Sequence, residues 1–393
     1  EMDVWGEHLL NALESEDDTE VLSGHGLIDS VTNAVINLMP GSRIYAENYG
    51  SILVAQNFSN LTVRGFGSGT IDGTRAGVGD TNKIAGALSF RGENWNPTVD
   101  GVRFVNLPNQ AITHLFTQND RATKGTWRIQ NNYFDNIGQT NFQYAPDGAG
   151  AQPDGNALSG IPYNSIVTGN VGRRLWRGFV EWDAYNIPDL TVGGGLVANN
   201  DVEVFRFGFD TRSSEDESTT FVKTLIADNI LKMMDVEIAL QRQMFWLQNV
   251  DGMAIQGNQI YLGTNYTIGE RGLNIVGDVS NLSFTDNDVF GGNSPLYQSS
   301  AGGGYLSNFT IDGNRFYDSY GPSVFFRING GSNQQYLYLF DVAIQDDRLT
   351  LTFRELDAMA NRFGHWAQSR RLKRGGRPAP RGERRRGRCR PAQ

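Results

Sequence analysis

Residues 280–290, Ser-Asn-Leu-Ser-Phe-Thr-Asp-Asn-Asp-Val-Phe, form a short alternating stretch, an asparagine and a second short stretch. Residues 307–317, Ser-Asn-Phe-Thr-Ile-Asp-Gly-Asn-Arg-Phe-Tyr, repeat this pattern. Short apolar stretches separated by Gly, Asn and Asp favour β-strands over helices. The pattern occurs seven times, and its central residues are Asn132, Asn170, Asn200, Asn229, Asn258, Asn287 and Asn314. The chain is therefore built from a repeated β unit.

The spacing of these asparagines predicts a solenoid. By subtraction, successive asparagines lie 38, 30, 29, 29, 29 and 27 residues apart, a period typical of stacked repeats. Asparagine tolerates the left-handed backbone region that such a turn needs. Stacked side-chain amides can also hydrogen-bond from one repeat to the next, so we expect an asparagine ladder. Phe66 and Val102 occupy the equivalent place in the two earlier repeats, where the ladder should be absent.

Each repeat also carries a third apolar stretch, upstream of the strand that leads to the asparagine. Three strands per coil close a triangular, parallel β-helix whose narrow core is filled by alternate residues. The sequence thus predicts an all-β parallel β-helix with three short strands per coil. These additional first-sheet stretches are residues 87–91, 111–115, 179–183, 207–212, 236–241, 272–276 and 323–327.

The domain organisation follows from where the repeat begins and ends. Residues 1–20 carry apolar side chains at helical spacing and are predicted to form a capping helix, or alternatively a partner-binding helix. Residues 21–331 form the parallel β-helix, and residues 332–368 form a last coil or a C-terminal cap. Residues 369–393 are Arg-, Gly- and Pro-rich, cannot build a core, and are predicted to be a disordered tail without assigned function.

Composition excludes several classes of protein. Residues 370–393 hold 11 Lys or Arg and one Glu, which leaves 34 − 11 = 23 basic and 43 − 1 = 42 acidic residues elsewhere, a charge close to −19. Such a body repels nucleic acid. No stretch approaches the ~20 apolar residues of a membrane span. Cys389 is the single cysteine, so an internal disulfide is impossible.

The repeat over roughly residues 40–330 resembles the right-handed parallel β-helix superfamily. That superfamily includes pectate-lyase-like polysaccharide lyases, polygalacturonase-like hydrolases, alginate epimerases and phage tailspikes. The resemblance implies a right-handed coil and a substrate groove along the first sheet. It also implies a polysaccharide partner, a monomer or homotrimer, and a bacterial protein that is secreted or held at the cell surface.

Ionisable residues gather in the first-sheet strands of the middle repeats. Equivalent positions in neighbouring coils lie about 4.8 Å apart, so residues remote in sequence become adjacent. Alternating carboxylates and guanidiniums suit proton abstraction from C5 of a uronate: an arginine neutralises the sugar carboxylate, a base removes the proton, and an acid assists the leaving oxygen or returns a proton. The first outcome is a lyase and the second an epimerase. A surface ion-pair network is the alternative explanation.

Two short segments assign roles within this cluster. Residues 207–212, Phe-Gly-Phe-Asp-Thr-Arg, are similar to the Tyr-Gly-Phe-Asp-Pro-His segment of mannuronan C5-epimerases, although Phe207 replaces the Tyr and Arg212 replaces the His. Residues 271–276 resemble a downstream segment of the same enzymes. We predict as catalytic Asp210, Arg212, Arg271 and Glu181. We predict as substrate-binding Arg177, Asp183, Arg206, Glu237, Arg242, Asn274 and His114.

Other activities remain open. Residues 68–73, Ser-Gly-Thr-Ile-Asp-Gly, resemble polygalacturonase-like hydrolases, and a non-catalytic glycan-binding, adhesin or tailspike-like β-helix is a further alternative. No cofactor is expected. Calcium among Asp147, Asp154 and residues 215–217 is possible on composition, although solvated loops explain these acidic residues more simply.

Overall fold

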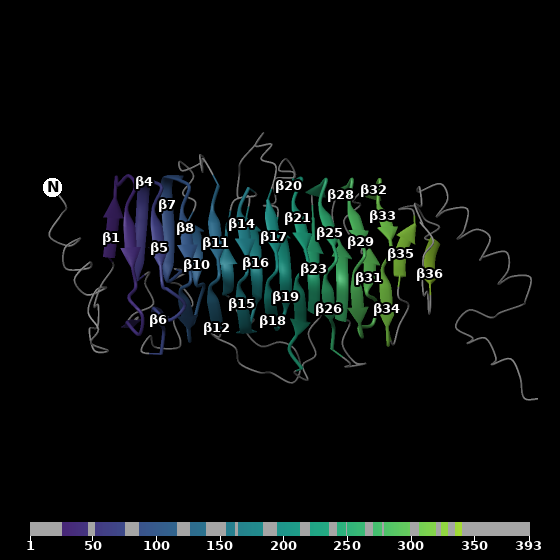
Figure 1. Ribbon diagram of the computed structural model, residues 1–393. Helices are drawn as coiled ribbons and strands as arrows, with labels where there is room; N and C mark the ends of the chain where they lie inside the picture. The colour runs from purple at the N-terminus through teal and green to yellow at the C-terminus, as the bar shows by residue number, and fades with distance from the viewer. Residues whose placement is uncertain are drawn as a thin grey trace, which may run out of the picture.

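The computed structural model describes residues 26–45, 52–74, 86–115, 126–138, 155–161, 164–183, 195–212, 221–235, 242–248, 250–263, 270–276, 279–298, 306–319, 324–328 and 335–339. Across these ranges the regular structure is entirely β, and the strands follow one another along a single elongated axis (Figure 1). Within the same ranges, no helix is long and apolar enough to cross a membrane.

The strands form three long sheets, A, B and C, and a small sheet D. Sheet A contains β1 (Gly26–Asp29), β4 (Leu53–Ser59), β7 (Leu88–Trp95), β10 (Ile112–Leu115), β13 (Asn156–Ser159), β16 (Gly178–Asp183), β19 (Phe207–Arg212), β23 (Arg242–Leu247), β27 (Glu270–Ile275), β31 (Leu296–Gln298), β35 (Val324–Ile328) and β36 (Gln335–Leu339). Sheet B contains β2 (Val35–Asn37), β5 (Thr62–Arg64), β8 (Thr98–Asp100), β11 (Arg128–Gln130), β14 (Ile166–Thr168), β17 (Leu196–Ala198), β21 (Leu225–Ala227), β25 (Ala254–Gln256), β29 (Ser283–Thr285) and β33 (Thr310–Asp312). Sheet C contains β3 (Arg43–Tyr45), β6 (Thr70–Asp72), β9 (Arg103–Val105), β12 (Tyr133–Ile137), β15 (Val171–Leu175), β18 (Asp201–Val204), β22 (Ile230–Met233), β26 (Gln259–Tyr261), β30 (Asp288–Phe290) and β34 (Arg315–Tyr317). Sheet D contains β20 (Phe221–Val222), β24 (Val250–Asp251), β28 (Val279–Ser280) and β32 (Leu306–Ser307).

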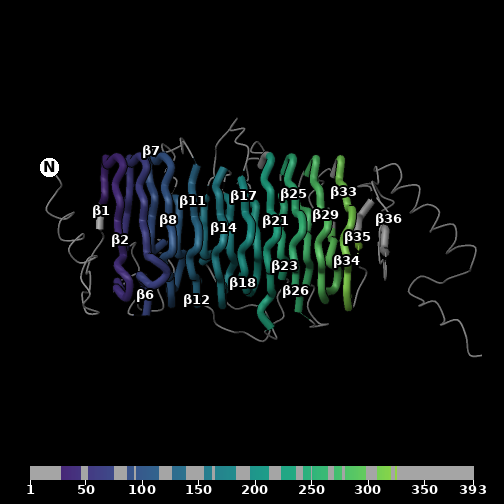
Figure 2. Tube along the Cα trace, in the orientation of Figure 1, coloured from purple at the N-terminus to yellow at the C-terminus, as the bar shows by residue number. Residues whose placement is uncertain are grey.

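The chain passes through sheets A, B and C in turn and then begins the next coil, so each strand pairs in parallel with its counterpart one coil away. The repeated coils are visible along the coloured part of the Cα trace (Figure 2). Crossovers between parallel strands of one sheet are overwhelmingly right-handed. The protein is a right-handed parallel β-helix, which confirms the predicted fold class.

The predicted asparagine ladder is present between sheets B and C. All seven side chains are buried, and from Asn132 to Asn314 each amide Nδ2 donates to Oδ1 of the next asparagine over 2.9–3.0 Å. The same Oδ1 atoms accept the backbone N–H of the preceding asparagine. Because every buried amide finds partners on neighbouring coils, the ladder holds the coils in register.

The residue with the left-handed backbone is not the ladder asparagine but the one before it. Asn131 has φ 57°, Asn199 has φ 56° and Gly257 has φ 66°, whereas the prediction placed this conformation at the asparagine itself. Val102 begins the ladder by donating its N–H to Oδ1 of Asn132. Phe66 does not occupy a ladder position, because its own φ is 50° and its side chain is exposed. The early turn at Phe66 is therefore built differently from the later ones.

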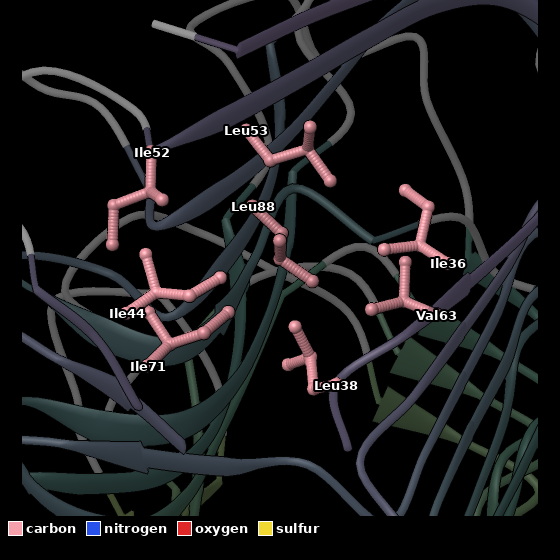
Figure 3. Close-up of a pocket in the computed structure, with 8 residues that line it drawn as sticks. All are labelled: Ile36, Leu38, Ile44, Ile52, Leu53, Val63, Ile71 and Leu88. Atoms are coloured by element: carbon pink, nitrogen blue, oxygen red, sulfur yellow. The ribbon is translucent and has the colours of Figure 1, made fainter. Parts of the chain in front are cut away.

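The core is a continuous column of apolar side chains from the three sheets. In the middle coils the rings of Phe209 and Phe245 stack in parallel, with centroids 5.0 Å apart. At the N-terminal end, aliphatic side chains from the first three coils line a small apolar pocket of about 10 Å³ (Figure 3). These are Ile36, Leu38, Ile44, Ile52, Leu53, Val63, Ile71 and Leu88.

The observed strands differ from the predicted boundaries in one coil. The first-sheet strand expected at residues 236–241 is instead β23, because residues from Arg242 to Leu247 pair with β27; residues 236–241 lie outside the described part. Strand β36 pairs antiparallel with β35 and falls within the predicted last coil or cap. The predicted capping helix at residues 1–20 and the tail at 369–393 lie outside the described residues.

Candidate functional site

The outward face of sheet A carries the candidate site. Along β16 and β19, Val180, Trp182 and Phe209 belong to the core, so the alternating Glu181 and Asp210 face away from it. Register places one residue from each coil in a single row across the sheet. This row is Ser159, Glu181, Asp210, Trp246, Asn274 and Tyr297.

The carboxylate of Glu181 is held by three side chains. Asn156 Nδ2 donates to Oε2, as does Ser159 Oγ over 3.1 Å, and the Arg177 guanidinium lies 3.6 Å from Oε1. Glu181 itself is only 6% exposed. A carboxylate with amide, hydroxyl and guanidinium partners is fixed in position and compensated for its burial.

Asp210 lies directly beside Glu181 on the next coil, and its side chain is 1% exposed. Burial, together with the negative charge of Glu181, raises the pKa of Asp210 to about 8 against the opposing effect of Arg177 and Arg206. Asp210 is therefore predominantly a neutral carboxylic acid at pH 7. The site combines a proton donor and a carboxylate on adjacent coils.

Arginine and aromatic side chains border this pair. The Arg206 guanidinium lies over the Phe207 ring at 4.6 Å, and the Phe207 and Trp246 rings are 5.2 Å apart. Burial and the charge of Arg177 lower the pKa of Arg206 to about 10, although Asp210 opposes this shift, so Arg206 stays cationic. Phe207, which replaces the tyrosine of the epimerase segment, is an apolar neighbour with no proton to transfer.

A second polar group lies farther toward the C-terminal end of the same face. Asn274 Nδ2 donates to Gln243 Oε1 over 2.6 Å, and both side chains are buried. The Arg271 guanidinium stacks on the Tyr297 ring, 3.5 Å from its centroid. Burial lowers the pKa of Arg271, partly opposed by Tyr297. Arg271 and Asn274, predicted separately, are thus brought together.

Two residues predicted to bind substrate are part of the interior instead. His114 shares the core side of β10 with Ile112, forms a 3.0 Å hydrogen bond with Asn94 and packs edge-on against Trp127. Arg242 is 1% exposed, pairs with the buried Glu270 and donates to the carbonyl of Met234. Their polar atoms serve core contacts, so neither side chain is available to a ligand on the sheet A face.

The remaining predicted residues are placed less fully. Asp183 and Arg212 pair in backbone register at the ends of β16 and β19, and their side chains lie outside the described part. Glu237 also lies outside it, as do Asp147, Asp154 and residues 215–217, where calcium was considered. Among the described side chains, no three His, Cys, Asp or Glu residues gather as a metal site requires.

The sequence reasoning missed several members of this face. Trp246 and Gln243 were missed because the strand was placed six residues too early. The spacing to the ladder asparagine could not have found them, because it changes between coils. Phe209 precedes Asn229 by 229 − 209 = 20 residues, whereas Phe245 precedes Asn258 by 258 − 245 = 13. Asn156 and Tyr297 carry no local signal, since only the register places them.

No protein-family model and no curated protein matches this sequence. Solved structures that resemble it include PfbA, a surface adhesin of Streptococcus pneumoniae, at 13% identity and a TM-score of 0.44 over 81% of this chain and 92% of the adhesin chain. Another is the tailspike protein of E. coli bacteriophage HK620 in complex with a hexasaccharide, at 10% identity and a TM-score of 0.43. That match covers 72% of this chain and 55% of the tailspike chain.

Proposed function

We propose that this protein binds a polysaccharide along the outward face of sheet A and hydrolyses a glycosidic bond between Glu181 and Asp210. The observation that supports this function is the protonated Asp210, whose pKa is raised to about 8, next to the Glu181 carboxylate. Paired carboxyl groups in different protonation states are the basis of glycoside hydrolysis. Polysaccharides are met mainly outside the cell, so the proposal includes secretion or display at the cell surface.

In this mechanism Asp210 is the general acid. Its O–H gives a proton to the glycosidic oxygen as the bond to the anomeric carbon breaks. Glu181 attacks that carbon to form an ester, and water then hydrolyses the ester while returning a proton to Asp210. Arg177 and Arg206 lie near both carboxyl groups, where they stabilise the Glu181 carboxylate before it attacks and the negative charge that develops on Asp210 as it gives up its proton.

The register also supports a stereochemical outcome. Glu181 and Asp210 pair directly across β16 and β19, which sets their backbones about 4.8 Å apart. Retaining glycosidases hold their carboxyl groups about 5–5.5 Å apart, whereas inverting enzymes need about 6.5–9.5 Å to admit a water. Side chains that project in parallel from adjacent coils keep roughly the separation of their backbones, so we propose hydrolysis with retention of anomeric configuration.

A second candidate is abstraction of the C5 proton of a uronate. A lyase then eliminates the leaving oxygen, whereas a C5-epimerase returns a proton to the other face of the sugar. Arg177 and Arg206 favour it, because two guanidiniums beside the carboxyl pair would neutralise a sugar carboxylate and acidify C5. A glycan-binding protein without turnover is the remaining possibility. The near-complete burial of Glu181 and Asp210 favours it.

The test measures products from polygalacturonate, alginate and a neutral glucan. Hydrolysis releases reducing ends with retained configuration by NMR, elimination gives an unsaturated product that absorbs in the ultraviolet, and epimerisation exchanges the C5 proton with solvent. The Asp210→Asn variant should lose about 100-fold or more of the activity. Asp72→Asn, which changes another buried aspartate on sheet C, should not. If a glycan binds but none of these products forms, the hydrolase proposal is wrong and the protein is a glycan-binding protein.

A further inference from the structure

Several arginines on the surface of the coil are paired with aspartates, whereas Arg271 pairs with none of the described ones. Arg173 pairs with Asp201, Arg174 with Asp135 and Arg315 with Asp288. Within the part of the chain that the structure describes, the half-buried Arg271 forms no ion pair, and its guanidinium lies against the Tyr297 ring. The guanidinium is therefore partly desolvated and held flat on an aromatic face, with its N–H edge uncommitted to any described carboxylate.

Asn274 presents a complementary feature three residues further along β27. Its Nδ2 is committed to Gln243, and its Oδ1 is buried without a hydrogen-bond donor among the described residues. An orphaned acceptor at a buried position is costly and calls for a partner. Tyr297 pairs in register with Asn274, so the uncommitted acceptor and the Arg271–Tyr297 stack belong to one place.

Stacking alone does not single out Arg271, because Arg103 lies over the Tyr133 ring at 4.3 Å on sheet C. What distinguishes Arg271 is the unsatisfied oxygen beside it and its place on sheet A, in the strand that carries Asn274. The N–H groups of the Arg271 guanidinium can donate to a carboxylate, and the neighbouring Asn274 Oδ1 can accept a hydrogen bond from a hydroxyl. Together they match a sugar unit that carries both a carboxylate and a free hydroxyl.

We propose that Arg271, Asn274 and Tyr297 form a subsite for a carboxylate-bearing sugar unit. The carboxylate accepts hydrogen bonds from Arg271, and a hydroxyl of the same unit donates to Asn274 Oδ1. This inference rests on the proposed function, since it requires the glycan to lie across sheet A. Asn274 stands two coils from Asp210, roughly 10 Å along the axis, so the acidic unit is not the one whose bond is cleaved.

The experiment measures binding by calorimetry in the Asp210→Asn variant, which prevents turnover. The probes are oligogalacturonate, an alginate oligomer, the carboxyl-reduced neutral form of each, and a sulfated galactan oligomer. Adding Arg271→Gln should weaken binding of at least one uronate oligomer by about 10-fold to 100-fold and leave its neutral form unchanged. Arg103→Gln, the matched stacked arginine on sheet C, should change neither.

The outcomes separate this inference from the function on which it rests. If none of the oligomers binds, the proposed function falls. If a uronate oligomer and its neutral form bind equally, or if Arg271→Gln weakens both alike, the glycan site stands and the acidic subsite is overturned. Preference for the sulfated oligomer would overturn the carboxylate assignment. Asn274→Leu should weaken uronate and neutral oligomers alike, since it removes the hydroxyl acceptor, and thermal unfolding of each variant verifies the fold.

Discussion

At the scale of single residues, the surroundings of Asp210 destabilise its ionised form and thereby keep the carboxyl group protonated and able to donate a proton. The carboxyl group faces outward from sheet A but is almost fully buried and lies beside Glu181. Both conditions oppose ionisation, and Arg177 and Arg206 only partly offset them. A proton is therefore retained at neutral pH, which an exposed aspartate cannot do.

This retained proton predicts the pH dependence of stability. Between about pH 4 and pH 8 the folded state keeps the Asp210 proton, because its pKa is raised to about 8, while the unfolded chain has lost it. The folded state binds more protons in this window, so Asp210 makes stability fall as the pH rises through it and level off above pH 8. The Asp210→Asn variant should lack this contribution. Melting temperatures of both proteins from pH 5 to pH 9 check it; parallel curves would contradict the raised pKa.

At the scale of the element, the ladder asparagines tie each turn between sheets B and C to its neighbours. Asn229 accepts the backbone N–H and side-chain Nδ2 of Asn200, and donates to the carbonyl of Val197 and to Asn258. One side chain thus satisfies several buried backbone and amide groups on three coils. The turns can have short, variable flanking sequences because the ladder supplies their hydrogen bonds.

Replacing one ladder asparagine tests how much the ladder stabilises the protein. Asn229→Ala removes the acceptor of the Asn200 backbone N–H and the donor to the Val197 carbonyl and to Asn258 Oδ1, and should destabilise the protein by about 2–4 kcal/mol. Gln259→Ala, which changes an exposed amide one residue after ladder Asn258, should cost less than about 0.5 kcal/mol. Denaturant unfolding measures both. Equal shifts of the unfolding midpoint would show that the ladder adds nothing beyond ordinary side-chain contacts.

At the scale of the whole molecule, a β-helix has ends that its own repeat cannot cover. The core runs as one column through the coils, and at its N-terminal end the buried Ile36, Ile44 and Leu53 border a small apolar pocket (Figure 3). An uncovered end of such a column would expose apolar side chains, which is unfavourable in water. The amphipathic pattern of residues 1–20 has the composition to cover it.

Deleting residues 1–20 tests whether they form the predicted cap. The shortened protein should melt at lower temperature and bind more of a fluorescent dye that reports exposed apolar surface, because the N-terminal pocket loses its cover. Deleting residues 370–393, which contribute no apolar core, serves as the control and should change neither quantity. If the melting temperature is unchanged after the N-terminal deletion, the prediction that residues 1–20 cap the core is wrong.

The amino-acid sequence by itself determined the parallel β-helix, its three strands per coil and the asparagine ladder. These features are repeated locally in every coil, so seven copies of one pattern express them. It also brought Glu181 and Asp210 together, because they are 210 − 181 = 29 residues apart, one period of the repeat.

Only the tertiary structure decided which side of each strand the remaining residues occupy. It assigned Arg242 and His114 to the interior, replaced residues 236–241 by β23, and joined Arg271, Asn274 and Tyr297. The physical reason is that insertions between coils change the count of residues without changing the stacking, so register and burial depend on pairing between coils. The raised pKa of Asp210 is a product of that burial.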